Sequence, residues 1–180
     1  MNYSTVLHYW FSEGNKKYWF NSTAEVDAEI EEKFEDVWIM ATAGELDFWQ
    51  DTPEGSLALI IVLDQFPLNM FRGEAKSFQT ERQAIEVTLK AIKNGYDNKL
   101  SGSELSFLLM PLMHSEKLED QDLSIKQFAM HNLASNLQFA QHHRDLIIEF
   151  GRFPHRNAIL GRENTRKEID YLASKRAFMG

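Results

Sequence analysis

The chain has 180 residues, a formal net charge of −8 at pH 7 and no cysteine. This length suits one hydrophobic core, so a single domain over residues 1–180 is predicted. Hydrophobic residues make up 43% and charged residues 26% of the chain, which excludes collagen-like, low-complexity and disordered proteins. The lack of cysteine excludes disulfides, thiol nucleophiles and cysteine-ligated zinc.

Composition also limits which binding partners and which cellular location are expected. The longest uncharged apolar stretch, Leu57–Leu63, is shorter than the roughly 20 residues that span a bilayer, so no membrane segment is expected. The negative net charge argues against binding to nucleic acid or to an anionic membrane. Residues 1–10 lack the basic and apolar regions of a secretion signal, and together with the lack of cysteine this predicts a cytoplasmic protein.

Apolar residues recur at helical spacing along nearly the whole chain, and no stretch shows the sustained alternation of a strand. An all-α fold of about eight helices in antiparallel hairpins is therefore predicted. The first helix carries Val6, Leu7, Trp10 and Phe11 on one face and ends near Gly14.

Capping residues predict where the next helices begin and end. Ser22 and Glu25 have capping-box spacing and open the second helix, which Gly44 closes. Residues 22–54, which include this helix, hold eleven acidic residues and one lysine. The acids of the helix lie on the faces away from its apolar stripe, as expected of a surface that contacts solvent. Thr52–Pro53 opens a very apolar third helix, because threonine is a good N-cap and proline fits the first turn.

Further helices are predicted, in chain order, at Phe78–Asn94, Leu105–Met110, Leu118–Leu133, Leu137–Phe150 and from Thr165 onward. Ser101 with Glu104, and Thr165 with Glu168, have capping-box spacing. Pro111 is predicted to kink or end the short helix that contains it, because proline disrupts helical hydrogen bonding.

Five stretches, taken in order and spacing, resemble an uncharacterised bacterial family whose known members have an all-helical, TPR-like fold. The stretches are Val6–Phe11, Ala43–Trp49, Leu63–Gly73, Met110–Glu116 and Phe150–Arg162, the last followed by Thr165 and Glu168. Their most specific parts read LDQFPxNMFRG, MPLMHSE and GRFPHRNxxLGR. The resemblance covers nearly the whole chain, and it implies a TPR-like fold without an established activity.

Three positions depart from the pattern of that family. Leu68 and Glu149 stand where arginine is common in the family, and Asn164 stands where serine is common. The loss of a guanidinium at position 68 removes a planar bidentate donor, so an anion pocket in this chain is expected to differ from that of its relatives.

Hydrogen-bond donors gather on the loop predicted around Pro154. They are Arg152, His155, Arg156, Asn157 and Arg162, and residues 142–166 hold five of the eight arginines of the chain. Guanidinium groups bind phosphates and carboxylates, so this loop predicts binding of a small anionic ligand or of the acidic end of a peptide. The alternative is structural, because the same arginines can clamp helices together by pairing with acids such as Asp64 or Glu116.

A second cluster, His114, Ser115 and Glu116, follows Pro111. His114, Glu116 and His155 are candidate catalytic residues, because a histidine and an orienting carboxylate can form a general base. The alternative is helix capping by Ser115 and Glu116. No ligand spacing such as HExxH occurs, so no metal and no other cofactor is predicted.

Asp64 follows the very apolar third helix. A buried carboxylate is destabilising unless it is paired, so Asp64 is predicted to pair with Arg72 or with an arginine of the 152–162 loop. Asp64 and Arg72 therefore join the candidate ligand-binding residues.

Three functions remain open from the sequence. The first is a helical binding module that holds a small anion or an acidic peptide end at the arginine loop. The second is a hydrolase-like enzyme that uses His114, Glu116 and His155 beside the same arginines. The third is a structural or protein-interaction scaffold that docks through the acidic helix over Glu25–Asp36. The sequence indicates no oligomeric state.

Overall fold

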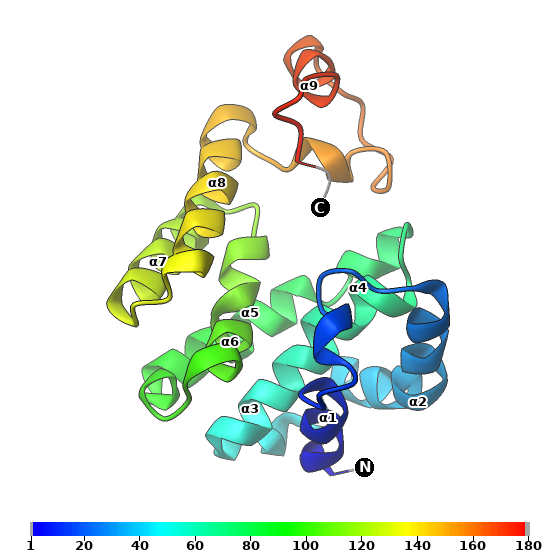
Figure 1. The fold of residues 1–180 in the computed structure, drawn as a ribbon, viewed down its shortest axis with the longest axis vertical. Helices are drawn as coiled ribbons and strands as arrows, with labels where there is room; N and C mark the ends of the chain where they lie inside the picture. The colour runs from blue at the N-terminus through cyan, green and yellow to red at the C-terminus, as the bar shows by residue number, and fades with distance from the viewer. Residues whose placement is uncertain (1, 179–180) are drawn as a thin grey trace.

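The computed structural model describes residues 2–178, and every regular element in that range is helical. The α-helices are α1 Tyr3–Trp10, α2 Ala24–Thr42, α3 Pro53–Ile60, α4 Phe66–Met70, α5 Glu81–Lys93, α6 Gly102–His114, α7 Leu118–Met130, α8 Ala134–Phe150 and α9 Arg166–Leu172. The all-α prediction is confirmed. Figure 1 places α9 at the opposite end of the molecule from α1 and α3. No helix within residues 2–178 is long and apolar enough to cross a membrane.

Two of the predicted helix starts have the expected hydrogen bonds. The Thr52 side chain accepts from the Gly55 N–H at the start of α3, with Pro53 in the first turn. Thr165 and Glu168 form a full capping box at the start of α9, because each side chain accepts from the backbone N–H of the other residue.

The other two predicted capping boxes are wrong. Thr23, not Ser22, caps α2 by accepting from the Val26 N–H, while Ser22 donates to the Asp27 carboxylate. Ser101 occupies the N-cap position of α6, but its side chain makes no capping hydrogen bond. Adjacent hydroxyls compete for the same cap, so the spacing of residue types did not decide between Ser22 and Thr23.

One continuous helical stretch contains α3, a π-helical turn at Ile61–Gln65 and α4. The wide turn is closed by the Phe66 N–H, which donates to the Ile61 carbonyl. Pro67 has no N–H to donate to the carbonyl of Leu63, four residues earlier. The Thr80 hydroxyl donates to that carbonyl at 2.6 Å. A buried threonine from the next helical segment thus satisfies the carbonyl that the proline leaves free.

Pro111 was predicted to kink or end α6, and the second of these outcomes is wrong, because the helix continues to His114. The buried Thr88 hydroxyl of α5 donates to the Leu108 carbonyl of α6 at 2.9 Å, whereas the carbonyl that Pro111 leaves without its helical donor is that of Phe107, four residues earlier. The additional turn of α6 carries the His114 side chain to the position described below.

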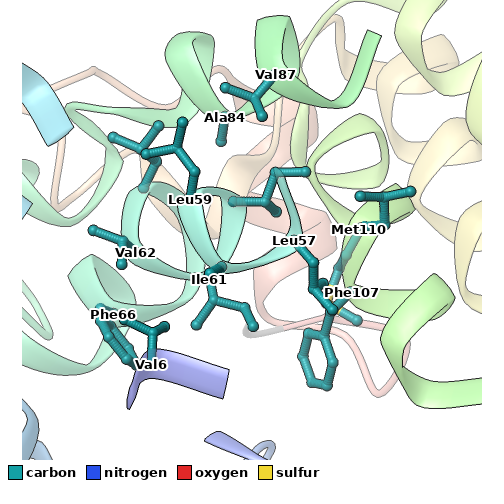
Figure 2. Close-up of a cluster of buried hydrophobic side chains, with 14 of the residues drawn as sticks. Val6, Leu57, Leu59, Ile61, Val62, Phe66, Ala84, Val87, Phe107 and Met110 are labelled. Atoms are coloured by element: carbon teal, nitrogen blue, oxygen red, sulfur yellow. The ribbon is translucent and has the colours of Figure 1, made fainter. Parts of the chain in front are cut away.

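Helix α3 lies at the centre of the main hydrophobic core, and Figure 2 shows its side chains meeting those of several other helices. All residues of Leu57–Leu63 are buried. Phe66 is fully buried and stacks on Phe34 of α2 with ring centroids 4.6 Å apart. A helix that is apolar on all sides can be stable in this position because other helices cover every face.

Gly55 allows α3 to approach the preceding turn closely. A Cβ atom at position 55 would lie 2.1 Å from the Trp49 carbonyl oxygen, whereas a Cβ at Gly14 would meet nothing within 4 Å. We predict that Gly55→Ala lowers the free energy of unfolding by about 1–3 kcal/mol, because the backbone must shift to relieve the overlap. Urea denaturation of this variant and of the control Gly14→Ala tests the prediction. Equal midpoints for the two variants would contradict it.

Candidate functional site

The candidate site lies where the C-terminal segment, residues 151–178, meets the helices before it. Gly151 turns the chain out of α8 with a φ of +72°, and its N–H donates to the Ile147 carbonyl. Phe153 then enters a small hydrophobic cluster with Leu146, Ile147 and Tyr171. We call the surface between this segment and the ends of α5 and α6 the junction.

Arg162 pairs with Glu116 at the junction. The guanidinium makes two hydrogen bonds to the carboxylate, at 2.7 and 2.9 Å, and Glu116 also accepts from the Phe153 N–H at 2.8 Å. Burial raises the pKa of Glu116, but the hydrogen bonds from Arg162 and Phe153 outweigh it and hold that pKa below its usual value. Glu116 therefore fastens the C-terminal segment to the end of α6.

Arg156 is the most buried arginine of the junction, with the residue only 7% exposed. It donates to Glu81 at 2.7 Å and to the backbone carbonyl of His114 at 3.0 Å. Its guanidinium also lies over the Phe78 and Phe153 rings, 4.6 and 4.7 Å from their centroids. Burial raises the pKa of Glu81 in spite of the neighbouring Arg156.

Arg152 acts within the C-terminal segment. It makes two hydrogen bonds to Glu168, at 2.7 and 2.8 Å, and a third to the Glu163 carbonyl. The hydrogen bonds from Arg152 hold the pKa of Glu168 far below its usual value. Asn157 donates to both Glu168 and Asn164, so one carboxylate organises the loop and the start of α9.

The three loop arginines therefore each have a carboxylate partner, the arrangement expected of a structural clamp. Several polar atoms in the same loop lack a partner within the described residues. They are His155 Nδ1, Arg156 Nε, Asn157 Oδ1 and Arg162 Nε, all of them buried. Buried polar atoms without partners are costly, so these atoms are the least satisfied part of the junction.

The prediction that Asp64 pairs with an arginine is wrong. Its Oδ1 atom accepts from His114 Nδ1 at 2.9 Å, and its Oδ2 atom accepts from the Gln65 amide. The loop arginines are paired with glutamates instead, and α6 extends far enough to bring His114 beside Asp64. Asp64 is 5% exposed and lies on the π-helical turn, a feature frequent at functional sites.

Only one of the two ring nitrogens of His114 is occupied by the contact with Asp64. No described residue forms a hydrogen bond with Nε2 of His114, and the side chain retains 17% exposure. An imidazole held through Nδ1 by a carboxylate is oriented to accept a proton at Nε2. Arg156 lies beside the same residue, because it donates to the His114 carbonyl.

The predicted site residues Arg72 and His155 form no hydrogen bond with the Asp64–His114 pair. Arg72 forms hydrogen bonds to Asp27 at 2.7 and 3.1 Å and contacts Asn69, so it joins α2 to α4 rather than reaching the junction. His155 packs against Phe153 and Phe178 in an aromatic cluster and forms no hydrogen bond with Asp64 or His114.

The structure also supplies residues that sequence reasoning missed. Glu81 is the partner of Arg156, although it resembles an ordinary acid in the first turn of a helix. Gln65 supports Asp64 from the adjacent position. Glu81 carried no sequence signal, whereas Gln65 stands out in the sequence as a second polar residue, beside Asp64, at the end of the apolar stretch. Within residues 2–178, no three histidine or acidic side chains gather in a group that could hold a metal ion.

Comparison with known proteins places the chain in a family. Residues 6–176 match the model of a family described as "Bacterial protein of unknown function (DUF924)". The chain belongs to this family. A solved structure described as that of a protein of unknown function, ATU0120 from Agrobacterium tumefaciens, is 37% identical to the chain. It superposes with a TM-score of 0.88 over 95% of this chain and 96% of that one. No curated protein matches the chain.

Two histidines of this DUF924 protein, the buried His143 of α8 and the half-buried His155, make its stability depend on pH. Burial lowers the pKa of His155 to about 4 and that of His143 to about 3. Unfolded histidine has a pKa of about 6.5, so the unfolded state binds more protons between about pH 4 and 6.5. The stabilisation is therefore complete above pH 6.5 and is lost as the pH falls.

We predict that the free energy of unfolding decreases from pH 7 to pH 5, with up to about one extra proton bound per histidine by the unfolded state. Denaturation at several pH values measures this slope. A His143→Leu variant should show a shallower slope, and His8→Gln, which changes an exposed histidine of α1, should match the parent. A parent stability that stays constant from pH 7 to pH 5 would contradict the prediction.

Proposed function

We propose that the junction is a general acid–base site that hydrolyses a small anionic molecule. The observation that carries the proposal is the buried carboxylate of Asp64 at 2.9 Å from His114 Nδ1, with Nε2 left without a partner among the described residues. In this arrangement Nε2 takes a proton from a water molecule, and the resulting hydroxide attacks the substrate. Asp64 then stabilises the imidazolium and keeps the ring in one orientation.

Charge at the junction supports an anionic substrate. Arg156 lies against the His114 backbone, and the Nε atoms of Arg156 and Arg162 have no acceptor among the described residues. Guanidinium N–H groups match carboxylate and phosphate oxygens, and fixed donors near the reacting atom stabilise developing negative charge. Arg152 and Asn157 support this site indirectly, because they hold the loop that carries Arg156.

The structure changes the role proposed for Glu116 and His155. Glu116 is bonded to Arg162 and to the Phe153 N–H, so we assign it to positioning the loop rather than to orienting His114. Burial disfavours a proton on His155, so we assign it to packing. Asp64 takes the orienting role that the sequence assigned to Glu116.

We predict that a panel of anionic carboxyl-ester, amide and phosphate-ester substrates reveals turnover, and that His114→Asn lowers kcat by about 10²–10⁴-fold. Asparagine is the suitable replacement because its amide N–H can still donate to Asp64 while the base at Nε2 is lost. Circular dichroism and the melting temperature of the variant show whether the fold is kept.

A matched control is available within the chain. His131 pairs with Asp97 at 3.0 Å in a second buried pair, through Nε2 instead of Nδ1. His131→Gln removes that imidazole and should leave kcat unchanged. Absence of turnover on the whole panel, or equal kcat for the parent and His114→Asn, would refute the proposal.

A further inference from the structure

Glu81 lies at the junction and has no role in the proposed hydrolysis. It is the first residue of α5, and Arg156 donates to its carboxylate through Nη1 at 2.7 Å. The same guanidinium donates through Nη2 to the His114 carbonyl at 3.0 Å. Because Nη1 and Nη2 are bonded to one carbon, Arg156 holds the Glu81 carboxylate close to the end of α6 that carries His114.

The pair with Arg156 uses only one of the two carboxylate oxygens of Glu81. Oε2 accepts from Arg156, whereas no described residue forms a hydrogen bond with Oε1. A carboxylic acid can accept from a guanidinium at one oxygen while its other oxygen carries a proton. Oε1 is therefore able to donate to a bound molecule without loss of the contact with Arg156.

The surroundings of Glu81 favour this protonated form. Burial raises the pKa of Glu81, and the neighbouring carboxylate of Asp64 raises it further. The positive charges of Arg156 and of a protonated His114 oppose the shift, but the net result is a raised pKa. Asp64 and His114 thus both lie near enough to act on the Glu81 carboxyl group.

Hydrolysis by the His114 base also needs a proton donor. His114 takes a proton from water at Nε2, and the hydroxide attacks the acyl carbon of an ester or amide. When the bond from that carbon to the leaving oxygen or nitrogen breaks, the leaving atom must gain a proton unless it is a stable anion. The side chains of His114 and Glu81 are 17% and 22% exposed, so a bound molecule can reach each of them.

We propose that Glu81 is the general acid of this site, an inference that rests on the proposed function. Glu81 donates the Oε1 proton to the leaving atom as its bond to the acyl carbon breaks, and the electron pair of that bond forms the new O–H or N–H bond. The proton that His114 took from water then returns to Glu81 through solvent, which restores both groups. The assignment favours substrates whose leaving groups are strong bases, such as alkyl esters and amides.

Two anionic substrates with the same acyl group separate an acid from a structural residue. Monoethyl terephthalate releases ethoxide, which needs a proton, whereas mono(4-nitrophenyl) terephthalate releases a stable nitrophenolate. We expect Glu81→Gln to lower kcat/KM on the ethyl ester by about 10²-fold or more and to leave that on the aryl ester nearly unchanged. Glutamine still presents an oxygen to Arg156 but has no acidic proton to give.

Glu86→Gln is the control, because it changes an exposed glutamate of the same helix and should leave kcat/KM on both esters unchanged. Equal losses on the two esters in Glu81→Gln, or no loss on the ethyl ester, would overturn the acid role. So would a parent that hydrolyses only the aryl ester, although that result would agree with the base at His114. A parent without turnover on any anionic substrate refutes the proposed function, and the acid role with it.

The protonation of Glu81 can be measured without a substrate. In a ¹³C NMR titration of the glutamate carboxyl groups, the Glu81 signal is the one that Glu81→Gln lacks. We expect its pKa to lie above the usual glutamate value of about 4.3. Titration at or below that value would contradict the acid role even in an active parent.

Discussion

A single buried carboxylate constrains the centre of this fold. Asp64 lies inside a mainly apolar helical stretch, and its charge is stable there only if donors reach the carboxylate. Gln65 provides one donor from the same π-helical turn. His114 provides the other, and it does so only because α6 continues beyond Pro111. The position of Asp64 therefore determines how α6 must end against the α3–α4 stretch.

The junction depends on the same end of α6. The His114 carbonyl accepts from Arg156, and Glu116, two residues further, accepts from Arg162 and Phe153. Three of the five arginines in residues 142–166 are neutralised here, by glutamates that come from distant parts of the chain and from the start of α9. The other two, Arg144 and Arg166, pair with Asp122 and Asp170. Because these pairs are partly or fully buried, loss of one partner leaves the other uncompensated.

Local features of the structure followed from the sequence, whereas contacts between distant segments did not. The starts of α3 and α9 were predictable because Thr52–Pro53 and Thr165 with Glu168 act on their own helices. The need for a partner at Asp64 was also predictable from burial alone. Its identity was not, because it depends on whether α6 stops at Pro111. Proline breaks many helices, and here the core around α5 and α6 outweighs that local preference.

In the candidate site, too, the sequence identified the residues but not the distant partners that they contact. The sequence identified the arginine loop, His114 and Glu116, and it gave both a clamp and an anion site as interpretations. It did not pair Arg156 with Glu81, which is 75 residues away. It also assigned Arg72 to the site, although the chain folds Arg72 against Asp27. Residue type indicates which groups need partners, and only the packing of helices decides which partners they meet.

The protonation of the His114 ring is the most direct test of this account. In ¹⁵N NMR at neutral pH, with histidine signals assigned by substitution, Nδ1 of His114 should carry the proton and Nε2 should not. His131 is an internal reference, because Asp97 is bonded to its Nε2 and the opposite tautomer is expected there. A His114 ring protonated at Nε2 and not at Nδ1 would contradict the Asp64 contact and the base assigned to the site.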